Sequence, residues 1–171
     1  MQKIILIPTI ISSLRIAVLP LFVYLYNPSN IAPCLILLAF SASTDFFDGY
    51  LARKLGATSR FGAYYDATTD FTLIIGIFAF FTIREFYSIW LPLLITASFV
   101  QFIVTSHYAK KHYDPIGKYI GSALYIGIVL TLVFPTQATY NFAQYAFVGF
   151  FLVSLGSRII SLARKRDTKL N

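Results

Sequence analysis

The chain has 171 residues, of which 57% are hydrophobic and only 12% are charged, with a formal net charge of +7. Soluble domains usually carry about a quarter charged residues, so this composition argues against a soluble all-helical domain with an apolar core. Apolar runs recur along the whole length, and each is about long enough to cross a bilayer. The sequence therefore predicts an all-α integral membrane protein.

The apolar runs and the breaks between them predict six membrane-spanning helices. "YNPSN", "LGATS" and "FPTQATY" supply turn residues, and "IREFY" and "AKKHYDPIGK" are the other breaks. Residues 1–8 can form a short helix on the membrane surface, and the N-terminal run lacks a small-residue cleavage site, so we expect it to be retained. We expect one domain, residues 1–171, without internal repeat. The predicted spans are Thr9–Tyr26, Ile31–Leu55, Arg60–Thr82, Ser88–Tyr108, Tyr119–Phe134 and Asn141–Ala163.

The basic residues predict the orientation in the membrane. With six spans both termini share one side, and that side collects every Lys and Arg except Arg84. The positive-inside rule then predicts cytoplasmic termini. We expect the protein to lie in the inner membrane of a prokaryotic cell, with its active site facing the cytoplasm. The positive charge needs no nucleic acid partner, since the basic C-terminal tail suits anionic lipid headgroups. The single cysteine, Cys34, excludes an intramolecular disulfide.

Four of the seven acidic residues lie close together in the second and third predicted helices, at Asp45, Asp48, Asp66 and Asp70. At about 100° per residue, each pair shares one face of its helix. The two helices form an antiparallel hairpin that turns near Ala57, so the two pairs lie at similar depth. We expect all four carboxylates to converge in one patch near the cytoplasmic side.

Carboxylates in a membrane need a counter-charge. One at the bilayer centre costs roughly 2.5–3.5 kcal/mol on insertion scales, and four together repel one another. Such a cluster takes up protons or binds cations, and carboxylate oxygens suit Mg²⁺, Mn²⁺ or Ca²⁺. No histidine pair stands beside them, which argues against zinc. Two divalent ions would neutralise the cluster and form a clamp for phosphoryl transfer.

A divalent-cation channel or carrier is the non-enzymatic alternative, because acids inside a membrane often mark ion routes. A transport path needs polar groups across the whole membrane. Here the outer halves of the second and third helices, "IAPCLILLAF" and "LIIGIFAFF", are apolar. The pattern therefore favours a site at one end over a path.

Small residues share the faces that carry the aspartates, at Gly49, Ala52 and Gly62. They can let the helices pack closely, or leave room for a ligand beside the metals. Their spacing relative to the aspartates favours the ligand. Arg53, at the edge of the face, can pair with a carboxylate or grip a phosphate.

The pattern D-x2-D-G-x2-A-R-x8-G-x3-D-x3-D resembles the signature of the CDP-alcohol phosphatidyltransferase family, and all eight fixed positions are present. Upstream, "IPTIISSLRIAVLPLF" resembles the first helix of the family, with Pro8 and Arg15. Thr9 and Ser12 depart from it, since the family often has Asn and Thr there. The resemblance covers almost the whole chain.

The resemblance implies a membrane-embedded homodimer with a polar cavity open to the cytoplasm. It implies transfer of a substituted phosphate group from a CDP-linked donor, usually CDP-diacylglycerol, to an alcohol, with release of CMP. It also implies Mg²⁺ or Mn²⁺ as cofactor, with Asp70 as the general base. The implied metal ligands are Asp45, Asp48, Asp66 and Asp70, and the implied CDP-binding residues are Gly49, Ala52, Arg53 and Gly62.

The acceptor alcohol is less well indicated. Phosphatidylglycerophosphate synthases within the family often continue the third-helix motif as Asp-Pro-x-Ala-Asp-Lys, whereas this chain has Ala67 and Phe71 at the Pro and Lys positions. Glycerol 3-phosphate remains the leading acceptor, with serine, inositol and inositol phosphate as alternatives. A phosphorylated acceptor needs cations around the cavity, although a lysine such as Lys118 can also simply reach the lipid headgroups. The candidates are Arg15, Lys110, Lys111, Lys118 and Arg158.

Overall fold

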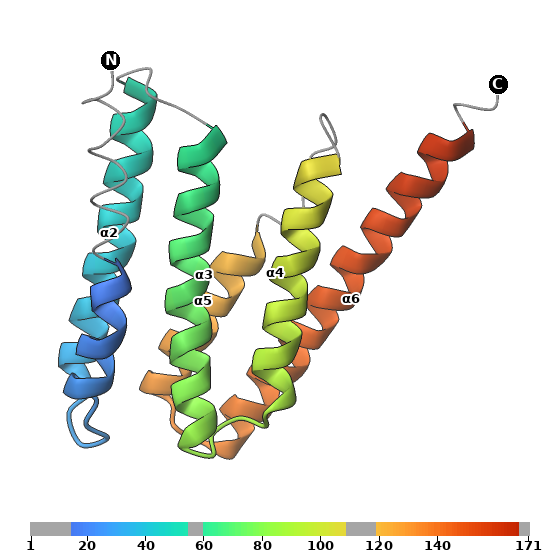
Figure 1. The fold of residues 1–171 in the computed structure, drawn as a ribbon. Helices are drawn as coiled ribbons and strands as arrows, with labels where there is room; N and C mark the ends of the chain where they lie inside the picture. Colours follow the sequence, from blue (N-terminus) through green and yellow to red (C-terminus); the bar gives the residue numbers. More distant parts are fainter. Residues whose placement is uncertain (1–14, 55–59, 109–118, 168–171) are drawn as a thin grey trace. The chain divides into compact units, whose positions relative to one another are not determined.

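The computed structural model describes residues 15–54, 60–108 and 119–167, which form helices joined by turns (Figure 1). This confirms the all-α class. The start of the first predicted helix and the breaks at residues 55–59 and 109–118 lie outside the described residues. The helices are Arg15–Leu25, α2 (Ala32–Lys54), α3 (Arg60–Ile83), α4 (Trp90–Tyr108), α5 (Ile120–Val133) and α6 (Gln137–Asp167).

The chain divides into two compact units, Met1–Ile83 and Arg84–Asn171, and each is described by itself. The first contains Arg15–Leu25, α2 and α3, and the second contains α4, α5 and α6. Some side chains within the helices are outside the described set. They include those at positions 45, 48–53 and 157–167.

A tight turn joins the first described helix to α2, as "YNPSN" predicts. The amide of Asn30 donates to the carbonyl of Asn27 (3.0 Å), with Pro28 at the position where its fixed φ suits a turn. The side chain of Asn27 accepts from the amide of Ser29 (3.0 Å), and that of Asn30 accepts from the amide of Ala32 (3.3 Å). Asn27 therefore closes the turn, and Asn30 provides an acceptor for the first amide of α2.

Large and small side chains pack the first described helix against α3. Phe22 is fully buried, and its ring lies edge-on to Phe80 and Phe81, with ring centroids 6.2 Å apart in each pair. One turn earlier, Leu19 lies so close to Gly76 that a methyl group at that position would collide with it. The partners advance together along both segments, so the two helices run in the same direction.

The buried face of α2 consists of Cys34, Leu38 and Ser41, which recur at helical spacing. The Cys34 thiol lies 3.7 Å from the carbonyl of Phe22, so the start of α2 is next to the end of the first described helix. Cys34 can be buried without a disulfide partner, because a free cysteine packs as a small apolar group.

In the second unit, the break predicted at "FPTQATY" is present at residues 134–136, and α6 begins at Gln137, four residues before the predicted start. The hydroxyl of Thr136 accepts a hydrogen bond from the amide of Thr139 (3.3 Å). The backbone carbonyl of Thr136 accepts one from the amide of Tyr140 (3.1 Å). Thr136 is thus an N-cap that starts the helix inside the expected turn. The helix also runs to Asp167, past the predicted end at Ala163.

Aromatic and hydroxyl contacts hold the start of the second unit. Phe86 stacks on Tyr140 with ring centroids 5.0 Å apart, and Tyr87 is hydrogen-bonded to Thr131 of α5 (2.5 Å). The connection from α3 turns at Glu85, which has a left-handed φ of 63°. The predicted break at "IREFY" is therefore confirmed.

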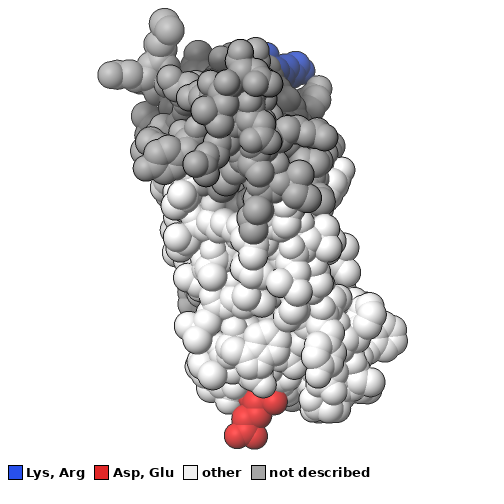
Figure 2. Space-filling model, turned by 90° about the vertical axis from the view of Figure 1, so that its right-hand side faces the viewer, with Lys and Arg blue, Asp and Glu red and all other residues white. Residues whose placement is uncertain are grey.

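One helix within the described residues, Tyr64–Ile83, is long and apolar enough to cross a membrane. The other apolar stretches described are shorter, so the count of six spans remains a prediction. Many large apolar side chains are exposed, and the described surface in Figure 2 carries almost no charge over the face shown. Exposed apolar surface of this extent suits a lipid environment.

Candidate functional site

The predicted site residues on the third helix lie on successive turns of α3, at Gly62, Asp66 and Asp70. Four-residue steps keep side chains on one face of a helix. The structure brings the carboxylates of Asp66 and Asp70 together on that face, because both bind the same nitrogen of one arginine.

That arginine is Arg15, at the start of the first described helix. Its Nη1 donates to Oδ1 of Asp66 at 3.0 Å and also to Oδ1 of Asp70. The Arg15 side chain is only 1% exposed, whereas those of Asp66 and Asp70 are 40% and 41% exposed. The guanidinium is therefore packed inside the unit, whereas about two-fifths of each carboxylate side chain remains exposed.

The helix packing explains how residues 51 and 55 positions apart meet. Leu19 lies one turn after Arg15 and packs on Gly76 of α3. Because the two helices run in the same direction, Arg15 then falls beside the earlier turns of α3. A buried arginine is tolerated only when carboxylates or other acceptors compensate its charge.

Threonine hydroxyls surround the two aspartates but donate to the backbone. Thr69 is buried and its hydroxyl donates to the carbonyl of Asp66 (2.8 Å). The hydroxyls of Thr68 and Thr72 donate to the carbonyls four residues earlier, at 2.7 and 2.8 Å. These bonds satisfy the hydroxyls within α3, as apolar surroundings require.

On α2, helical spacing relates the described buried face to the other half of the predicted site. Steps of four and three residues from Cys34, Leu38 and Ser41 lead to positions 45 and 48. The side chains of Asp45 and Asp48, like those of Gly49, Ala52 and Arg53, lie outside the described set.

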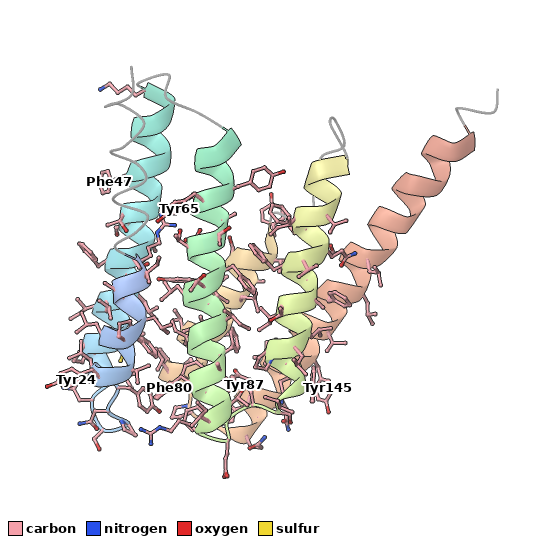
Figure 3. The ribbon with its side chains drawn as sticks, viewed as in Figure 1. Tyr24, Phe47, Tyr65, Phe80, Tyr87 and Tyr145 are labelled. Atoms are coloured by element: carbon pink, nitrogen blue, oxygen red, sulfur yellow. The ribbon has the colours of Figure 1, made fainter. Side chains whose placement is uncertain are left out.

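The ends of the hairpin can be followed in Figure 3. Phe47 on α2 and Tyr65 on α3 lie toward one end of the first unit, and Tyr24 and Phe80 lie toward the other. Residues on either side of the α2–α3 connection thus share one end of the hairpin. This arrangement is compatible with the predicted pairing of the aspartates by depth.

The carboxylate oxygens of Asp66 and Asp70 are suitable ligands for a divalent cation. Among the described residues, no group of three or more His, Cys, Asp or Glu side chains is placed to hold a metal. However, oxygens of Asp66 and Asp70 already converge on a single cationic nitrogen, so one positive centre can contact both. Carboxylate oxygens are ligands that Mg²⁺ and Mn²⁺ prefer.

Of the cations predicted to bind the acceptor, Arg15 is the one whose side chain the structure describes. Arg15 is buried against two carboxylates. Lys110, Lys111 and Lys118 lie outside the described residues, and Arg158 is on α6 with its side chain outside the described set. Sequence reasoning missed the partners of Arg15, although a lone arginine in an apolar run signals that a carboxylate partner is needed.

Comparisons with known proteins agree with the motif. The family model described as CDP-alcohol phosphatidyltransferase matches residues 5–156. Two curated relatives carry the name CDP-diacylglycerol–glycerol-3-phosphate 3-phosphatidyltransferase, from Pectobacterium atrosepticum and Yersinia enterocolitica. Each is 34% identical over 129 residues, which cover 73% of this chain and 70% of the relative.

A Pseudomonas fluorescens protein with the same name is 37% identical over 91 residues, covering 51% of this chain and 46% of that protein. No solved structure matches the chain.

Proposed function

Because the chain belongs to the CDP-alcohol phosphatidyltransferase family, and is thus a transferase, we propose that it moves a phosphatidyl group from CDP-diacylglycerol to glycerol 3-phosphate. The names of the relatives support this acceptor, since the matches span most of both chains. Ala67 and Phe71 depart from the usual motif of enzymes with this acceptor, so the acceptor needs a direct test. The membership in a transferase family speaks against the channel or carrier alternative.

The observation that carries the proposed chemistry is the convergence of Asp66 and Asp70 on one face of α3, where each side chain is partly exposed. We assign Asp70 as the general base. The acceptor hydroxyl gives its proton to Asp70 as its oxygen forms a bond to the phosphorus that carries diacylglycerol. The bond from that phosphorus to the bridging oxygen breaks, and CMP leaves with the bonding electron pair.

We propose that Asp45, Asp48, Asp66 and Asp70 hold two Mg²⁺ or Mn²⁺ ions. Bound divalent ions would stabilise the negative charge on the pyrophosphate oxygens. Of this ligand set, the described side chains of Asp66 and Asp70 support the proposal by their convergence. The other two follow from the motif and from helical spacing on α2.

We propose a CDP site beside the metals, in which the small residues of both helices leave space for the nucleotide. Gly62 lies one turn before Asp66 on α3 and is partly exposed. Arg53 would offer a planar, charged group to the diphosphate. The proposed CDP-binding residues are Gly49, Ala52, Arg53 and Gly62.

The phosphate of the acceptor would need a cation with an open side. Lys110, Lys111, Lys118 and Arg158 remain proposed for this role. Arg15 was predicted in the same group, but its burial and its two bonds to carboxylates favour a different role, which is argued below.

We propose that the enzyme lies in the inner membrane of a bacterial cell with six spans, both termini and a polar cavity facing the cytoplasm. The bacterial relatives, the apolar helix Tyr64–Ile83 and the distribution of basic residues support this placement. The family match crosses the boundary between the two units, which supports a single functional domain. A homodimer remains an expectation from the family resemblance.

An acceptor screen tests the proposal. Purified protein in detergent would receive CDP-diacylglycerol and Mn²⁺ with glycerol 3-phosphate, serine, inositol or inositol phosphate, and CMP release would be measured. We expect CMP only with glycerol 3-phosphate. Release with another acceptor alone would correct the substrate, whereas no release with any acceptor would contradict the proposed transfer.

A further inference from the structure

We propose that Arg15 is a positioning residue that acts as the resident counter-cation of Asp66 and Asp70 and thereby weakens the binding of divalent metal. This inference rests on the proposed function, because it concerns the metal site of that reaction. It assigns Arg15 to the carboxylates and not to the acceptor.

The contacts of Arg15 support this role. A single nitrogen, Nη1, binds Oδ1 of both Asp66 and Asp70. Within the spanning part of α3, the charged side chains that the structure describes are Asp66 and Asp70. Within the first described helix, the charged side chain is Arg15. One guanidinium thus holds both carboxylates in a common orientation and compensates part of their charge.

The difference in exposure shows from which side each group is reached. Arg15 is 1% exposed, and Leu19 and Phe22 on the following turns of its helix pack against α3, so its charge is held in place. Asp66 and Asp70 are each about two-fifths exposed. A metal ion would approach their exposed surface, while the buried guanidinium stays in place.

Electrostatics then predicts the effect of Arg15 on metal binding. A fixed positive charge within several ångströms of a divalent ion repels it, and the surroundings of a partly buried site screen this repulsion poorly. Removing the charge should strengthen metal binding by about tenfold or more. The carboxylates would also lose the group that orients them, so turnover should fall even when the metal site is full.

A role for Arg15 in holding the acceptor phosphate predicts a different pattern. Such a residue needs an open face toward the ligand, whereas Arg15 is buried. Its loss would raise the KM for the acceptor and leave metal affinity unchanged. Opposite changes in metal affinity and turnover therefore distinguish the two roles.

The test measures Mn²⁺ binding to purified full-length protein in detergent by electron paramagnetic resonance, together with CMP release at saturating Mn²⁺. Arg15→Gln removes the charge, and Arg15→Lys keeps it. Arg84→Gln is the matched control, because it removes an arginine charge from the exposed connection after α3. We expect Arg15→Gln to bind Mn²⁺ about tenfold or more tightly than the wild type and to turn over more slowly.

We expect Arg15→Lys and Arg84→Gln to bind Mn²⁺ with wild-type affinity. Unchanged or weaker binding by Arg15→Gln, in protein that elutes like the wild type, would overturn the inference and leave the proposed function intact. If Arg15→Gln does not fold, the Mn²⁺ affinity of Arg15→Lys becomes the test. A marked gain in that affinity would contradict a role based on charge. Failure of the wild type to bind Mn²⁺ would refute both the inference and the proposed metal dependence.

Discussion

Replacing Asp70 with asparagine is expected to remove most of the transfer activity while leaving the fold intact. The two side chains have the same shape, and the amide oxygen of asparagine can still accept a hydrogen bond from Nη1 of Arg15, as Oδ1 of Asp70 does. The side chain is 41% exposed, so the loss of its charge leaves no unsatisfied group in a sealed core. What the substitution removes is the basic oxygen, together with one negative charge of the proposed metal site.

A positioned general base contributes about 100- to 10,000-fold to a rate, so the turnover of Asp70→Asn should fall within that range. This corresponds to roughly 3–5 kcal/mol on the activation barrier. The assay is steady-state CMP release from CDP-diacylglycerol at saturating glycerol 3-phosphate and Mn²⁺. Turnover within a few-fold of the wild type, in protein that inserts and purifies normally, would refute the role of Asp70 as base.

Thr68→Val is the matched control for this experiment. Thr68 lies on the same helix, half a turn before Asp70, and its hydroxyl donates to the carbonyl of Tyr64 at 2.7 Å. Because that bond is local to the helix backbone, its loss should leave turnover near the wild-type value. A large loss in the control would mean that the assay reports disturbance of α3 and not the chemistry of Asp70.

Three further predictions follow from the same structure. Activity should require Mg²⁺ or Mn²⁺, and full CMP release in excess chelator would contradict the metal site. Phe22→Ala should lower the free energy of unfolding by about 3–5 kcal/mol, because the ring is fully buried against Phe80 and Phe81. The control Tyr24→Ala, at an 84% exposed position of the same helix, should lower it far less, and thermal unfolding measures both. Thr136→Ala should cost about 1 kcal/mol through loss of the N-cap, and Thr136→Ser should restore the melting temperature.

The sequence predicted the helices well where an apolar run ends at residues with strong turn chemistry. Asn27, Pro28 and Asn30 form the expected turn, and Asn30 provides an acceptor for the first amide of α2. The same reasoning placed the start of α6 four residues too late, because a threonine in a Pro-containing stretch is equally compatible with a turn and with a helix cap. Whether the turn or the helix cap forms depends on how the following residues pack, as Tyr140 packs on Phe86.

The site was predictable to the extent that it depends on spacing within one helix. Asp66 and Asp70 fall on one face of α3 as four-residue spacing requires. The position of Arg15 was not predictable in this way, since its contact with α3 depends on two helices running in the same direction and on the close approach of Leu19 to Gly76. Such tertiary contacts leave no periodic signal in the sequence.

The most direct test of the central claim is identification of the lipid product by mass spectrometry. Purified protein would be incubated with CDP-diacylglycerol, glycerol 3-phosphate and Mn²⁺, with omission of each component in turn. The account predicts phosphatidylglycerophosphate in the complete reaction, in amounts equal to the CMP released, and none when any component is missing. Phosphatidic acid in its place, or no new lipid at all, would contradict transfer to glycerol 3-phosphate.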